Sequence, residues 1–142
     1  DTDAGTIDGY KWCLDNWGTK WGDCHTTYET FMRDEYAENG TQHIVFNYDT
    51  AWGPANFAKV AELWPTLTFI TRYDESGMGF LGVWAWANGE EVADLEMNHD
   101  DPLYPDPPDH DDIDVDPGAW YDKIYALLDQ LEAKAEQQIP VA

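Results

Sequence analysis

The sequence predicts an α+β sandwich, with two main helices on one face of a mostly antiparallel sheet of about five strands. Two segments alternate apolar and polar residues, as strands with one buried face do, turn signals separate three further strands, and two other segments repeat apolar residues at helical spacing. The chain has 142 residues, of which 43% are apolar and 15% aromatic, so it can bury one core.

The first half of the chain is expected to supply two strands and one short helix. Alternating residues predict strands over 10–15 (YKWCLD) and 44–48 (IVFNY). Between them, Thr26 and Glu29 fit a capping box, which predicts a helix over 26–32.

The middle of the chain predicts a second helix. Gly53-Pro54 opens this helix and Pro65 closes it. Its shared face would carry Phe57, Val60, Ala61 and Trp64.

A three-stranded meander should follow this helix. The strands are expected over 67–73, 80–87 and 91–97. Asp74 to Gly77 supplies the first turn, and Asn88-Gly89 is typical of a two-residue hairpin loop.

The end of the chain predicts an acidic loop and a long helix. Residues 98–116 hold eight Asp, four Pro and no Lys or Arg, so self-repulsion should keep this loop open and solvated. Asp116-Pro117 forms an N-cap and first-turn pair. The helix then carries one apolar stripe, Trp120, Ile124, Leu127, Leu128, Leu131 and Ala135.

This order of elements favours a ferredoxin-like sandwich. We expect one domain over 1–142, with an insertion near 22–42 and the acidic loop near 98–116.

Four segments resemble the YubB-type ferredoxin-like domain of plasmid and phage proteins. They are 12–21 (WCLDNWGTKW), 50–54 (TAWGP), 64–69 (WPTLTF) and 73–82 (YDESGMGFLG). The resemblance covers about Tyr10 to Met97 and implies a ferredoxin-like fold and a mobile-element origin. It implies neither iron nor electron transfer, and it brings no catalytic residues. The chain departs from the family in the insertion and in the acidic loop.

The charge is the other prominent feature. Asp and Glu number 29 against 7 Lys and Arg, a net charge of -22 that argues against binding to nucleic acid or to an anionic membrane. No apolar run approaches the roughly 18 residues of a membrane span. A basic protein surface is the expected partner, and the host cytoplasm is the expected location. Cys13 and Cys24 are either free thiols in that compartment or a disulfide pair.

Two groups of residues are candidates for partner binding. Trp17, Lys20 and Trp21 could form a cation–π contact and a rim for a partner, or could simply close one end of the sandwich. The second group lies in the acidic loop and comprises Asp109, Asp111, Asp112 and Asp114.

The same loop is a candidate calcium site. Asp112-x-Asp114-x-Asp116 resembles the start of an EF-hand, but Pro117 and Lys123 stand where that loop needs Gly and Glu. A looser site could use these three carboxylates with Asp109 and Asp111. Cys24, His25, His99 and His110 lack the paired spacing of strong zinc motifs.

No motif predicts an enzyme. Gly77-x-Gly79-x-x-Gly82 has the spacing of a dinucleotide fingerprint, but a strand rather than a helix is expected to follow it. The only serine is Ser76, in a turn. We therefore expect a non-enzymatic interaction module that binds a basic host protein surface, with DNA mimicry as one mode. The alternatives are acidity adapted to a saline host, since Asp and Glu far outnumber Lys, and a calcium-binding domain.

Overall fold

The computed structural model describes residues 5–18, 24–32, 44–50, 53–108 and 116–141, with the backbone alone for 5–10, 24–32 and 44–47. The chain divides into two compact units, Asp1–Asn56 and Phe57–Ala142. Each unit is described by itself.

The first unit contains one helix and one pair of strands. The elements are α1 (Gly5–Trp17), β1 (Cys24–Met32) and β2 (Ile44–Asp49), and β1 pairs with β2 in antiparallel orientation. The predicted strand at 44–48 is confirmed. The predicted helix at 26–32 is wrong, because that stretch belongs to β1; Thr, Tyr and Phe, which favour strands, make up most of its residues.

The predicted strand at 10–15 is also wrong, because these residues lie in α1. Lys11 Nζ pairs with Asp15 Oδ2 at 2.7 Å, one helical turn away. Gly18 ends the helix with a φ of 68°, and its N–H donates to the carbonyl of Leu14 at 3.1 Å. Trp12 is 55% exposed, so the alternation in this segment does not mark a buried strand face.

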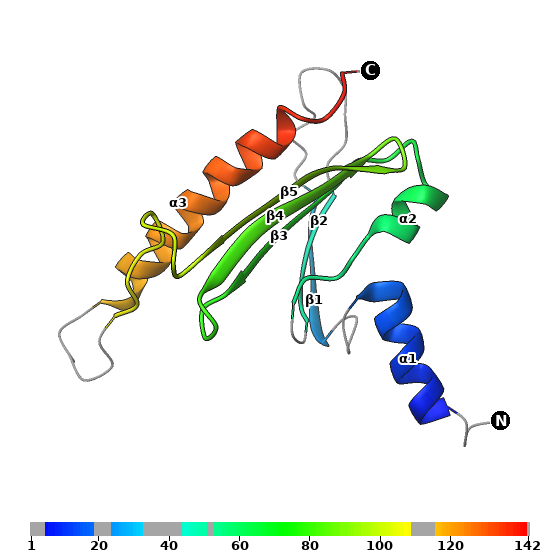
Figure 1. Cartoon of the computed structure of the whole chain (residues 1–142), viewed down its shortest axis with the longest axis horizontal. Coiled ribbons are helices and arrows are strands. Elements are labelled where there is room, and N and C mark those ends of the chain that lie inside the picture. The colour runs from blue at the N-terminus through cyan, green and yellow to red at the C-terminus, as the bar shows by residue number, and fades with distance from the viewer. Residues whose placement is uncertain (1–4, 19–23, 33–43, 51–52, 109–115, 142) are drawn as a thin grey trace. The chain divides into compact units, whose positions relative to one another are not determined.

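The second unit is built around the predicted meander, which is confirmed. Strands β3 (Phe69–Glu75), β4 (Phe80–Ala87) and β5 (Glu90–Asn98) form one antiparallel sheet in the order β3-β4-β5. Asn88 and Gly89 both have positive φ, 55° and 82°, as a two-residue type I′ hairpin turn requires. Helix α3 (Pro117–Glu136) runs along one side of the sheet, and the short helix α2 (Ala58–Leu63) lies toward the other (Figure 1).

The core lies between α3 and the sheet. Leu81, Val83 and Ala85 of β4 meet the predicted apolar stripe of α3. The buried residues of that stripe are Trp120, Ile124, Leu128, Leu131 and Ala135. The predicted N-cap is confirmed too, since Asp116 Oδ1 accepts a hydrogen bond from the Gly118 N–H at 2.9 Å.

Arg72 links β3 to α3. Its guanidinium lies 2.9 Å from Asp129 Oδ1 and 2.7 Å from Glu132 Oε2. The cation thus offsets two of the many carboxylates, and it does so on the side of the sheet that faces α3.

The expected sheet of about five strands with two main helices on one face is wrong. The described strands form a three-stranded sheet and a separate two-stranded pair, and α3 alone runs along the larger sheet. One expected strand is helical, and the helix expected from Gly53 begins only at Ala58 and has 6 residues. Trp64, expected on its buried face, is 59% exposed. The ferredoxin-like arrangement is therefore not the fold of the described residues.

The acidic loop is more ordered up to residue 108 than predicted. Tyr104 is buried in the core, and Pro105 accepts a hydrogen bond from Trp120 Nε1 at 3.2 Å. The side chains of Asn98 and Asp101 each accept a hydrogen bond from a backbone N–H two residues on. Local turns and one buried ring thus outweigh charge repulsion here, whereas 109–115 lie outside the described residues.

Asp74, which lies beside this loop, should make the free energy of unfolding depend on pH. Burial and then the charge of Glu75 raise the pKa of Asp74, and Arg72 only partly offsets them. Because the native state binds this proton more tightly than the unfolded state, ionised Asp74 costs stability at neutral pH. Asp74→Asn should therefore raise the free energy of unfolding by about 0.5 kcal/mol at neutral pH. Thermal unfolding at several pH values measures this gain.

The gain should decline as the pH falls through the raised native pKa of Asp74, and it should vanish below the ordinary pKa of the unfolded chain, where the carboxyl is neutral in both states. Asp106→Asn, at an exposed loop position, changes the net charge equally and serves as the control. An equal gain in both variants would show that the relief comes from net charge alone.

Candidate cation-binding face

The side of the sheet away from α3 gathers aromatic rings and carboxylates. Alternate residues of a strand lie on opposite faces, and Leu81, Val83 and Leu95 pack on the α3 side. Their neighbours therefore form the other side. We call it the acidic–aromatic face, and it comprises Phe69, Tyr73, Phe80, Gly82, Trp84, Trp86, Glu91, Asp94 and Glu96.

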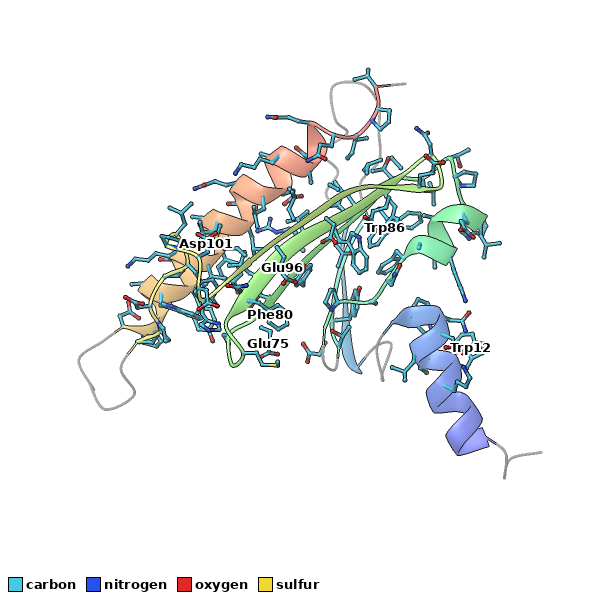
Figure 2. All side chains as sticks on the ribbon, viewed as in Figure 1. Trp12, Glu75, Phe80, Trp86, Glu96 and Asp101 are labelled. Atoms are coloured by element: carbon cyan, nitrogen blue, oxygen red, sulfur yellow. The ribbon has the colours of Figure 1, made fainter. Side chains whose placement is uncertain are left out.

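The strand register arranges this face in rows across the sheet. Tyr73 pairs with Gly82, which pairs with Glu96. In the next row Trp84 of β4 pairs with Asp94 of β5. Figure 2 shows Phe80 and Glu96 on the sheet and Trp86 toward α2, whereas Asp101 lies beside α3.

Gly82 allows Tyr73 to cross the central strand. A Cβ at Gly82 would collide with the Tyr73 hydroxyl and would lie 2.6 Å from the carbonyl oxygen of Leu95. With no side chain there, the Tyr73 hydroxyl reaches across and donates a hydrogen bond to Glu96 Oε2 at 3.1 Å. The glycine thus places a phenol against a carboxylate on the far strand.

Tyr73 holds its proton firmly in this position. Burial is the first cause that raises the pKa of Tyr73, and the charge and hydrogen bond of Glu96 and the charge of Asp94 add to it. Tyr73 therefore remains a neutral donor over the physiological range, and it orients the Glu96 carboxylate without cancelling its charge.

A second carboxylate is oriented in a similar way. Trp84 Nε1 donates to Glu91 Oε2 at 2.8 Å. The Trp84 ring also packs on Trp86, with centroids 4.7 Å apart. Phe57 packs against Trp86 and Phe69 and thereby fixes this end of the face.

The carboxylates of the face have no cationic neighbour among the described residues. Glu91, Asp94 and Glu96 are exposed, and no Lys or Arg of that part of the chain lies within 4.0 Å of them. Asp94 and Glu96 are two residues apart on one strand, so their Cα atoms are about 6.8 Å apart. The face therefore presents negative charge that nothing described on this chain offsets.

Such a combination suits Lys and Arg side chains. A carboxylate accepts charge-assisted hydrogen bonds from an ammonium or guanidinium group, and a Trp or Tyr ring attracts a cation to its face. Tyr73 and Trp84 already orient two of the carboxylates. These two side chains therefore lose less conformational freedom when a cation binds.

The predicted aromatic rim is described only in part. Trp17 is half-buried in α1 and makes an edge contact with Trp12, with ring centroids 6.4 Å apart. Lys20 and Trp21 lie outside the described residues. The cation–π contact expected among them stays a prediction.

The predicted acidic-loop sites fall mostly outside the described residues as well. Asp109, Asp111, Asp112 and Asp114 lie there, and Asp116 caps α3. Among the residues that are described, no three His, Cys, Asp or Glu side chains lie close enough together to hold a metal ion. Calcium binding by the loop stays a prediction.

The other motifs have structural roles where they are described. Cys13 is a free thiol in α1, and His99 lies 3.5 Å from the Asp100 carboxylate. In the glycine motif, Gly77 N–H donates to Glu75 Oε1, and Gly79 adopts a φ of 71° in the β3–β4 turn. A strand follows this turn, so no helix N-terminus is there to hold a pyrophosphate.

The sequence predicted the strand that carries Phe69 and Tyr73, but the acidic part of the site was missed. The signal was present, because Asp94 and Glu96 alternate with Leu95 and Met97 in a segment expected to be a strand. With 29 acidic residues in the chain, these carboxylates did not stand out by composition.

No helix in the described part of the chain has the length and apolar character needed to cross a bilayer.

Comparison with known proteins adds no further information. The chain matches no protein-family model, no curated protein and no solved structure. The resemblance to the YubB-type domain stays a prediction.

Proposed function

We propose that this chain is a non-enzymatic binding domain whose acidic–aromatic face takes the Lys and Arg side chains of a basic protein surface. The observation that carries the proposal is that Tyr73 and Trp84 orient the carboxylates of Glu96 and Glu91, with no described cation beside them. The host cytoplasm and the mobile-element origin, both expected from the sequence, remain part of this proposal.

The expected binding is fast and sensitive to salt. Exposed ion pairs contribute about 0.2–1 kcal/mol each, and exposed cation–π contacts about 0.5–1 kcal/mol, so several must act together. The net charge of -22 adds long-range attraction, which speeds association and which salt screens.

The spacing of the carboxylates favours a basic protein segment as the partner. A DNA-binding protein would require the carboxylates to mimic the phosphates of DNA. Strand β5 (9 residues) carries Glu90, Glu91, Asp94 and Glu96, or roughly one charge per 7–8 Å of strand. A DNA duplex carries one per roughly 1.7 Å. Carboxylates such as Asp122 and Glu136 also lie exposed on α3, away from this face. We therefore do not extend the proposal to DNA mimicry.

The test compares two triple variants with the same net charge. The face variant carries Glu91→Gln, Asp94→Asn and Glu96→Gln, and the control carries Asp106→Asn, Asp122→Asn and Glu136→Gln. Calorimetry with a synthetic oligolysine peptide in about 0.05 M and about 0.5 M salt measures affinity. The face variant should lose about tenfold in affinity at low salt, and the control less than about threefold. Equal losses would refute the proposal, because net charge alone would then explain the binding.

Adaptation to a saline host is a second candidate explanation of the charge. Exposed carboxylates with no described Lys or Arg within 4.0 Å also occur on α2, in the acidic loop and on α3, as at Glu62, Asp106 and Glu136. Under this explanation the Tm should keep rising into molar KCl. Simple screening should instead level off once the Debye length falls to about 3 Å, near 1 M. A plateau, together with full stability in dilute buffer, would contradict adaptation.

A further inference from the structure

We propose that the partner adds to the sheet as a fourth strand along β5, as an extended segment with Lys or Arg at alternate positions and apolar residues between them. The inference rests on the proposed function, since it specifies the kind of basic segment that the face takes.

The outer edge of β5 is available for pairing. Within the described part of the chain, β5 pairs with β4 alone, and the outer edge is used only at its end, where the Asn98 carbonyl accepts a backbone hydrogen bond from the Asp101 N–H at 2.9 Å. The pairing is irregular near Val92, where the register shifts between Ala85 and Trp86 of β4. From Ala93 to Asn98 the pairing is regular, and the N–H and C=O groups of Asp94 and Glu96 point outward as those of an edge strand do.

The alternation along β5 specifies the partner's side chains. Asp94 and Glu96 lie on the acidic–aromatic face, whereas Leu95 and Met97 pack against the α3 core. Residues directly opposite on a neighbouring strand have Cβ atoms about 4.5–5.5 Å apart. Cationic residues opposite Asp94 and Glu96 would form cross-strand ion pairs, and apolar residues opposite Leu95 and Met97 would extend the core.

The charge also argues against the two other possible occupants. A second copy would place one acidic β5 against another, and like charges directly opposite destabilise a strand pair. The chain's own segments do not fit, because its cations (Lys11, Lys20, Arg33, Lys59, Arg72, Lys123 and Lys134) never occur two residues apart. The segment that fits belongs to another protein.

The test uses the full chain and four peptides of one composition. The first alternates Lys and Val, and the second groups the same residues into a Lys block and a Val block. The other two alternate Lys and Val but are N-methylated at every Lys or at every Val. In an added strand only one of these sets of N–H groups points at β5, so each N-methylated peptide is the control for the other. Calorimetry measures affinity, and hydrogen exchange measures protection of the amides from Ala93 to Asn98.

We expect the alternating peptide to bind at least tenfold more tightly than the block peptide. One N-methylated peptide should lose at least tenfold in affinity while the other keeps it, and exchange of the outward β5 amides should slow at least tenfold. Binding with equal affinity for all four peptides and no protection would overturn strand addition while leaving the proposed function intact. If no peptide binds, or if the face variant binds as well as the wild type, the proposed function fails and this inference with it.

Discussion

Replacing Gly82 by alanine is expected to lower the free energy of unfolding by about 3 kcal/mol, the upper end of the cost of overpacking. The added Cβ would meet the Tyr73 hydroxyl and the carbonyl oxygen of Leu95, and Gly82 is buried in the central strand. The tyrosine must move, and its hydrogen bond to Glu96 is then lost. Denaturant unfolding, followed by tryptophan fluorescence, measures the change.

Two further variants separate this clash from the general effect of removing a glycine. The Cβ added by Gly118→Ala, in the first turn of α3, meets only the Asp116 side chain, with Oδ1 nearest at 3.0 Å, and the change should be neutral or slightly stabilising. Adding Tyr73→Leu to Gly82→Ala should recover part of the loss, because one of the two obstacles is gone. If Gly82→Ala costs no more than Gly118→Ala, the Tyr73 ring does not lie across β4.

Local signals predicted the meander and α3 of the second unit well. Asn88 and Gly89 supply the two positive φ values of a type I′ turn, and almost no other residue pair does so cheaply. The stripe of α3 spans its full length with a capping Asp at one end, so periodicity and termination agree. Where several local signals agree over a long segment, they determine its secondary structure, and tertiary packing rarely changes it.

The first unit shows where such signals fail. Over 10–15 the alternation covers only six residues, too few to distinguish a strand from a helix whose Trp12 is exposed. Over 26–32 the capping box competed with residues that favour strands, and pairing with β2 decided the outcome. The outcome over 26–32 thus depends on pairing with a second strand, which local patterns do not encode.

The candidate site was partly predictable for a similar reason. The predicted strand over 67–73 contains Tyr73, but the hydrogen bond to Glu96 requires three strands in register and a glycine in the middle one. Composition drew attention instead to the acidic loop, whose charge density is highest. Charge density marks where carboxylates are numerous, whereas the sheet determines which of them are oriented.

Ile124→Ala should destabilise the second unit by about 3 kcal/mol, because a buried Ile-to-Ala change removes apolar contacts and leaves a cavity. Ile124 is 1% exposed and belongs to the cluster that joins α3 to Leu81 and Val83. For a unit of this size the Tm should fall by on the order of 10–20 °C. Tyr125→Ala, at a 52% exposed position, is the control and should cost less than about 1 kcal/mol.

The same pair of variants connects the core to the binding face. Leu95 and Met97 pack against the α3 cluster, and this contact fixes the side of β5 on which Asp94 and Glu96 lie. Ile124→Ala should therefore bind the alternating Lys-Val peptide normally below its lowered Tm and lose binding in step with unfolding above it. If α3 did not support the sheet, Ile124→Ala and Tyr125→Ala would unfold alike, and peptide binding would not follow the melting of either.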